Sequence, residues 1–145
     1  DSVLIPTGQI APVEGTPFDF REPHAIGERI GADNQQLRNG GGYDHNWVID
    51  RKTESGIEQV ATVWEPASGR TIEVLSDQPG LQVYSGNFFD GKSIGKYGKP
   101  QRYRESLALE TQKFPDSPNH DNFPSTVLRP GETYTQVCIY KFGVK

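Results

Sequence analysis

Three polar side chains from separate stretches of the sequence could act together on one ligand: Asp44, Gln82 and Glu110. Glu110 ends an alternating run in which Leu107 and Leu109 point to one face of a strand and the glutamate points to the other. The run therefore places a carboxylate opposite the aliphatic packing. Two carboxylates and a carboxamide, with aromatic residues nearby in the sequence, are groups suited to binding a sugar.

The elements that would position these groups are short strands next to flexible turns. Asp44 follows the glycines at 40–42, where the backbone can take positive φ at little cost, and precedes a predicted strand at 47–49. Gln82 lies in an alternating run at 81–84 that predicts another strand. Polar residues at a junction between a glycine loop and a strand are well placed to face a ligand.

The rest of the chain predicts further strands. The sequence contains 16 glycines and 11 prolines, which fall between short runs rather than within long ones. The further predicted strands are residues 56–65 and 70–76, joined around the turn 66–69, and residues 133–142. Thr16 and Pro17 could open one short helical turn, residues 31–42 are predicted as a polar loop, and residues 90–102 as an exposed mobile loop. We expect one all-β unit over residues 1–145, an antiparallel sandwich.

Composition excludes several classes of partner. The chain has 145 residues and a net charge of −4 with no basic stripe, so nucleic acid is not an expected partner. No apolar run approaches the ~20 residues that cross a bilayer, so no membrane is expected. A single cysteine, Cys138, excludes an internal disulfide and is interpreted as a packing residue. His24, His45 and His120 are too scattered for a zinc pattern, so no metal is expected.

The sequence contains no methionine and starts at Asp1. We therefore expect that a preceding segment has been removed or belongs to another chain. The compartment stays open on this basis, with the cytoplasm favoured over the periplasm.

Several motifs, in this order and spacing, resemble those of the aldose 1-epimerase (galactose mutarotase) family. The matching stretches are residues 5–8, 15–20, GYDHN at 42–46, 68–70, PGLQVYSGN at 79–87, ETQ at 110–112, 114–115 and 123–125. Together they cover nearly the whole chain. The resemblance implies a large antiparallel β-sandwich, the galactose mutarotase-like supersandwich, that interconverts the α and β anomers of an aldose without a cofactor.

The resemblance also implies roles for the three polar residues. Glu110, in the Glu-Thr-Gln motif, would be the general base that takes the proton of the anomeric hydroxyl, while a histidine protonates the ring oxygen. Asp44 and Gln82 would hold sugar hydroxyls. A neutral sugar offers no charge to bind, so its orientation must come from such hydrogen bonds.

The chain departs from the family pattern in its acid catalyst. The family's catalytic histidine, its second site histidine and its asparagine-arginine pair belong to motifs upstream of the position that matches Asp1. The resemblance therefore implies that residues 1–145 are the C-terminal portion of a mutarotase-like domain. Its partner would be the N-terminal portion of the same protein, covalently joined or as a separate chain. His45 is interpreted as supporting the loop around Asp44, and His24 and His120 as solvated loop residues.

Other interpretations stay open. Glu110 could be a surface carboxylate, Asp44 a turn-forming aspartate and Gln82 a solvated strand residue. The chain could be a non-catalytic carbohydrate-binding sandwich, or a mutarotase-like protein that recognises a sugar phosphate or a polymer end without turnover. A third interpretation is an accessory domain of a glycoside hydrolase. The preferred aldose and the oligomeric state are not predicted.

Overall fold

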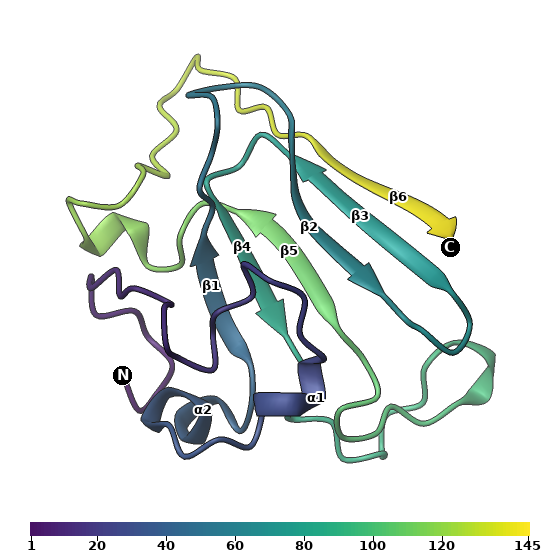
Figure 1. Cartoon of the computed structure of the whole chain (residues 1–145). Helices are drawn as coiled ribbons and strands as arrows, with labels where there is room; N and C mark the ends of the chain where they lie inside the picture. Colours follow the sequence, from purple (N-terminus) through teal and green to yellow (C-terminus); the bar gives the residue numbers. More distant parts are fainter. The chain divides into compact units, whose positions relative to one another are not determined.

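The computed structural model describes residues 1–145 and consists mainly of short strands joined by turns (Figure 1). Its α-helices are α1 (Ile26–Arg29) and α2 (Gln35–Gly40), and its 3-10 helices are η1 (Lys96–Gly98) and η2 (Ser117–Asn119). Its strands are β1 (Asp44–Val48), β2 (Glu58–Trp64), β3 (Arg70–Ser76), β4 (Gly80–Tyr84), β5 (Ala108–Gln112) and β6 (Cys138–Val144). None of the helices has the length and apolar character needed to cross a membrane.

The strands form two three-stranded sheets, with orders β1-β4-β5 and β2-β3-β6. Neighbouring strands run in opposite directions, as the arrows of Figure 1 show. The two α-helices contain only 4 and 6 residues. The predicted fold class, all-β with antiparallel sheets, is therefore confirmed.

The predicted hairpin between β2 and β3 is also confirmed. The amide of Glu65 donates to the carbonyl of Arg70 at 2.9 Å, and the Glu65 carboxylate accepts from the amides of Ala67 and Ser68 at 2.8 and 2.7 Å. Gly69 has φ +71°, a left-handed conformation that favours glycine. These contacts close the turn, so the alternating strands pair as the sequence predicts.

The last strand begins later than predicted. β6 pairs with β3 from Cys138, opposite Ser76, to Val144, whereas the sequence predicts a strand at 133–142. The amide of Val137 donates instead to both carboxylate oxygens of Asp77, at 3.1 Å each. The Asp77 side chain thus accepts from the backbone amide that a longer strand would use for pairing, and regular strand pairing starts one residue later, at Cys138.

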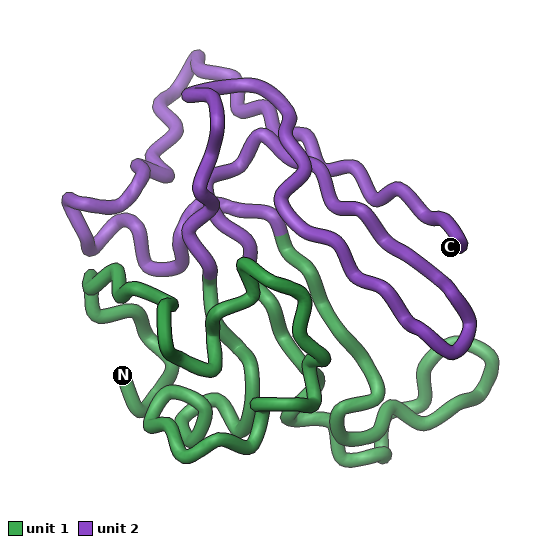
Figure 2. The backbone as a smooth tube through the Cα atoms, in the orientation of Figure 1, with its two compact units in different colours: residues 1–46, 82–110 green, residues 47–81, 111–145 purple.

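The chain divides into two compact units, which Figure 2 colours separately. Unit 1 contains residues 1–46 and 82–110, and unit 2 contains residues 47–81 and 111–145. The boundary falls within β1, β4 and β5. Asp44, Gln82 and Glu110 all belong to unit 1. The prediction that residues 1–145 belong to one domain of a larger sandwich stays a prediction.

The core of unit 1 is centred on Tyr43, which is 1% exposed. The rings of Phe18 and Phe20 pack against it edge-on, with centroids 5.8 and 5.4 Å away. Leu37 of α2 is buried as well. Since Tyr43 directly precedes Asp44, this core anchors the start of β1.

In unit 2, Val74 of β3 is fully buried, and Phe114 packs edge-on against Phe123 with centroids 5.2 Å apart. Unit 2 therefore has apolar packing of its own.

Helix α2 lies where the sequence predicts a polar loop, so that prediction is wrong for Gln35–Gly40. Asn34 caps the helix, with its Oδ1 accepting from the amides of Gln36 and Leu37 at 2.8 and 3.4 Å. Gly41, at φ +63°, ends it. An asparagine cap and a glycine end are the signals that could have identified this short helix.

The helical turn predicted at Thr16 is instead a turn without a helix. The Thr16 hydroxyl accepts from the amide of Phe18 at 3.1 Å, which favours a turn over a helical continuation. The first helix begins later, at Ile26.

Candidate functional site

The structure brings together two of the three predicted site residues. Gln82 Nε2 donates to Asp44 Oδ1 at 2.8 Å. Asp44 opens β1, and Gln82 lies in the neighbouring strand β4. The two residues are 38 positions apart in the sequence, so strand pairing is what places the carboxylate and the carboxamide side by side.

The other end of the Gln82 side chain is buried without a partner. Its Oε1 is inaccessible to solvent and has no hydrogen-bond partner within the protein. The orientation of the amide is fixed by chemistry, because only the NH₂ group can donate to the Asp44 carboxylate. A buried acceptor left unpaired typically costs about 1–3 kcal/mol. Such acceptors in native proteins call for an explanation, and a ligand that donates a hydrogen bond is one.

Glu110 lies in β5, the strand next to β4. The carbonyl of Gly86 accepts from the amide of Arg104 at 3.0 Å, and a Cβ added to Gly86 would lie 2.8 Å from Ser106 Oγ. The chain just after β4 therefore lies beside the chain just before β5. Gln82 precedes Gly86 by four residues and Glu110 follows Ser106 by four. Because β4 and β5 run antiparallel, the two residues are expected to lie at similar levels along their strands.

Glu110 is exposed, whereas the flanking Leu109 is half-buried and Thr111 is buried. The predicted alternation therefore holds for Leu109 and Glu110. The carboxylate is open to solvent and to a ligand.

A pocket of about 790 Å³ lies elsewhere in unit 1, lined by residues within 15–32 that include Asp19 and Arg29. Asp44, Gln82 and Glu110 do not line it, and their roles stay predictions.

The loop that positions Asp44 is held by Asn87, whose role the sequence analysis missed. Its Nδ2 donates to the carbonyls of Gly40 and Tyr43, at 2.9 Å each, and Asn87 is 8% exposed. Gly42 has φ +143°, and a Cβ there would lie 2.4 Å from Asn87 Oδ1. Gly42 thus has the positive φ predicted for the glycine loop before Asp44, and the structure adds that no space exists for a Cβ there.

His45 directly follows Asp44 in β1, so strand alternation predicts that its side chain points to the opposite face. Its Nδ1 accepts from the backbone amide of Asp44 at 3.0 Å, and its ring lies 4.6 Å from that of Phe18. These contacts agree with the interpretation that His45 supports the segment around Asp44.

The pKa of His45 leads to a prediction about stability. Burial lowers this pKa below its ordinary value of 6.5, while the Asp44 carboxylate acts in the opposite direction. A group with a lower pKa in the folded state stabilises the fold above its unfolded pKa, and this stabilisation is lost as pH falls towards the folded value. We therefore expect acidification from about pH 8 to about pH 5 to lower the free energy of unfolding more in the wild type than in His45→Asn.

The His45→Asn variant keeps an acceptor for the Asp44 amide and cannot take up a proton. Urea denaturation at the two pH values measures the difference. Equal losses in the wild type and the variant would contradict the prediction.

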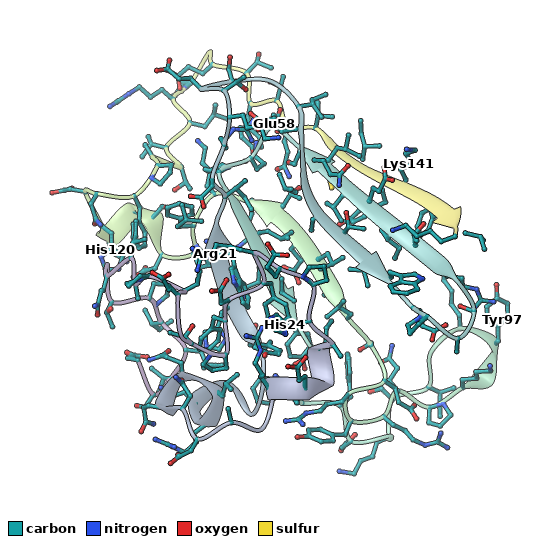
Figure 3. All side chains as sticks on the ribbon, in the orientation of Figure 1. Arg21, His24, Glu58, Tyr97, His120 and Lys141 are labelled. Atoms are coloured by element: carbon teal, nitrogen blue, oxygen red, sulfur yellow. The ribbon has the colours of Figure 1, made fainter.

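The other two histidines, labelled in Figure 3, lie outside β1 and β4 in the sequence: His24 comes before α1 and His120 directly after η2. His24 Nδ1 lies 3.1 Å from a carboxylate oxygen of Glu28 in α1. His120, in unit 2, has its Nε2 3.2 Å from Asp116 and its ring 4.8 Å from Phe123. His24 is exposed, as predicted for a solvated residue, whereas His120 is half-buried and that prediction is wrong for it. The ring of Phe123 and the Asp116 carboxylate hold His120 against the fold.

Comparison with known proteins identifies relatives along nearly the whole chain. The aldose 1-epimerase family model matches residues 1–141. Galactose mutarotase from Mus musculus is 45% identical over 144 residues, which are 99% of this chain and 40% of that protein. Aldose 1-epimerase from Escherichia coli (strain K12) is 38% identical over 140 residues, which are 95% of this chain and 40% of that protein.

The crystal structure of a GalM/aldose epimerase homologue from C. elegans superimposes with a TM-score of 0.85 at 32% identity, covering 99% of this chain and 42% of that one. The chain thus spans about 40% of the length of the curated relatives it matches. The match of the family model to residues 1–141 shows that the chain belongs to the aldose 1-epimerase family.

Proposed function

We propose that this chain forms part of an aldose 1-epimerase that interconverts the α and β anomers of aldohexoses such as galactose and glucose. Membership of the family supports the proposal, as do the activities for which its relatives are named. The structural observation that carries it is the hydrogen-bonded pair of Asp44 and Gln82, with its buried and unpaired carbonyl oxygen.

The proposed reaction needs proton transfers alone. A base removes the proton of the C1 hydroxyl, the bond between C1 and the ring oxygen breaks, and an acid delivers a proton to that oxygen. C1 is then an aldehyde carbon. Rotation about the C1–C2 bond and closure by the reverse steps give the other anomer. Each positioned acid or base contributes typically ~10²- to 10⁴-fold in rate.

The residues of this chain divide these tasks as follows. Glu110, exposed on β5, is the proposed base that removes the proton of the C1 hydroxyl. Asp44 and Gln82 orient the sugar by accepting hydrogen bonds from its hydroxyls, which suits the Gln82 Oε1 that has no donor within the protein. Orientation of this kind is worth more for a neutral substrate, because no charge is available to steer it.

The acid is proposed to come from outside this chain. The histidines of this chain have other contacts: His24 and His120 lie against the carboxylates of Glu28 and Asp116, and His45 Nδ1 accepts from the backbone amide of Asp44. We propose that a histidine of the N-terminal portion of the same mutarotase-like protein, covalently joined or as a separate chain, protonates the ring oxygen. Residues 1–145 would be the C-terminal portion of that domain.

Polarimetry of freshly dissolved α-D-galactose and α-D-glucose tests the proposal. The whole protein that contains this chain should accelerate the approach to the equilibrium rotation in proportion to its concentration. An unchanged rate at saturating protein would contradict the proposal.

A second candidate is a non-catalytic carbohydrate-binding protein of the same fold. It is favoured by the exposure of Glu110. Such a protein would bind the sugar saturably in calorimetry without accelerating mutarotation, so the two measurements together separate the candidates.

A further inference from the structure

Asn46 is a polar residue of β1 to which the proposed function assigns no task. It lies two residues after Asp44 in the same strand and is half-buried. Its Oδ1 is inaccessible to solvent and has no hydrogen-bond partner within the protein. A buried carbonyl oxygen of this kind typically costs about 1–3 kcal/mol unless a donor reaches it.

Strand pairing places Asn46 across from Gln82. The amide of Ser85 donates to the carbonyl of Tyr43 at 3.0 Å, which makes these two residues an opposed pair of the antiparallel ladder. Asn46 comes three residues after Tyr43 and Gln82 comes three residues before Ser85. In an antiparallel pair this places Asn46 opposite Gln82. Side chains directly opposed in such a ladder have Cβ atoms about 4.5–5.5 Å apart.

The hydrogen bond between Gln82 and Asp44 identifies the face of the sheet on which the Asn46 and Gln82 side chains lie. Residues two apart in a strand point to the same side, so Asp44 and Asn46 share a face of β1. Because Gln82 Nε2 reaches Asp44 Oδ1 at 2.8 Å, the Gln82 side chain lies on that face too. The face therefore carries two buried amide oxygens, Asn46 Oδ1 and Gln82 Oε1, and neither has a donor.

Two neutral acceptors on one face suit a ligand with several neutral donors. Sugar hydroxyls are such donors, and each can give one hydrogen bond to a carbonyl oxygen. We propose that Asn46 is a further substrate-binding residue, whose side-chain carbonyl accepts a hydrogen bond from one hydroxyl of the aldose. The inference rests on the proposed function and adds a third contact to those of Asp44 and Gln82.

The test compares wild type and Asn46→Leu in the whole protein, with galactose and its 2-, 3-, 4- and 6-deoxy analogues. Leucine has a similar shape and cannot accept a hydrogen bond. Polarimetry gives kcat/KM, and calorimetry gives Kd. We expect Asn46→Leu to lower kcat/KM and weaken binding about tenfold, the size of one neutral hydrogen bond, for every sugar but one. For the analogue that lacks the bonded hydroxyl, wild type and variant should agree.

Gln59→Leu is the control, because it also replaces the amide of a strand residue; Gln59 is exposed, in β2, outside the site. It should match the wild type on every sugar. Asn46→Val, a β-branched residue that suits a strand and cannot accept a hydrogen bond, is a second variant in case leucine prevents folding. It should show the same pattern across the analogues.

A loss of the same size for all five sugars would overturn the inference, since a purely structural asparagine would affect them equally. The rate of the wild type on galactose tests the proposed function separately. If the wild type binds sugars without accelerating mutarotation, the proposed function fails while the Kd series still decides the role of Asn46. If it neither binds nor accelerates, both fail.

Discussion

Replacing Glu110 by glutamine is expected to lower the rate of mutarotation by the whole protein about 10²- to 10⁴-fold. Glutamine keeps the shape of the side chain and can still form hydrogen bonds, but it cannot take up the proton of the C1 hydroxyl, which is the task proposed for Glu110. Because proton removal matters in the transition state, kcat should fall while KM changes little. Polarimetry across a range of galactose concentrations measures both constants.

Glu105→Gln provides the control for this experiment. Glu105 is also an exposed carboxylate, in the segment before β5, and its Oε1 lies 3.7 Å from Arg102. This variant should retain the wild-type rate. If Glu110→Gln kept full activity as well, Glu110 would not be the base, and the proton acceptor would have to be sought elsewhere in the protein.

Replacing Tyr43 by alanine is expected to lower the free energy of unfolding by about 3–5 kcal/mol, the usual cost of truncating a buried aromatic residue. Tyr43 is 1% exposed, and the rings of Phe18 and Phe20 both pack edge-on against it. Its hydroxyl donates to the carbonyl of Pro17 at 2.9 Å. The substitution leaves a cavity and an unpaired carbonyl next to the start of β1. Urea denaturation measures the loss.

Two control variants separate the contributions at Tyr43. Tyr43→Phe keeps the ring and removes only the bond to Pro17, so it should cost about 1 kcal/mol. Tyr97 (Figure 3) is 95% exposed, and Tyr97→Ala should change stability by no more than about 0.5 kcal/mol. A cost for Tyr43→Ala as small as that for Tyr97→Ala would show that the core of unit 1 lies elsewhere.

The sequence predicts those parts of the fold that depend on local patterns. The β2–β3 hairpin follows from alternation on both sides of a turn that ends at Gly69, and its register is set by that turn. The glycine loop before Asp44 follows from a need for positive φ, which glycine meets most easily. In both cases neighbouring residues carry the whole signal.

Other features depend on contacts between distant residues and are not readable from local patterns. Helix α2 has a single buried large apolar residue, Leu37, so it lacks the apolar stripe that usually identifies a helix. The start of β6 depends on the Asp77 carboxylate, 60 residues from Val137. Local alternation cannot reveal such a competitor for a backbone amide.

At the candidate site, too, local patterns predict some features and contacts between distant residues determine the others. The motifs identify Asp44, Gln82 and Glu110 as residues of interest, and β-sheet pairing explains why the first two meet. The unpaired oxygens of Gln82 and Asn46 follow from the register between β1 and β4. Asp44 and Gln82 are 38 positions apart in the sequence, and the register that brings them together is not encoded in either strand alone.

The bond between the Asp44 carboxylate and the Gln82 amide restricts the rotamers of both side chains through contacts internal to the protein. Immobilising a flexible side chain when a complex forms typically costs about 0.5–1.5 kcal/mol. For these two residues that entropy is already lost on folding, so the proposed sugar-binding surface would be preorganised. Such rigidity raises the binding affinity most for neutral ligands, because these ligands make few strong contacts that could offset the entropy cost of ordering the protein's side chains.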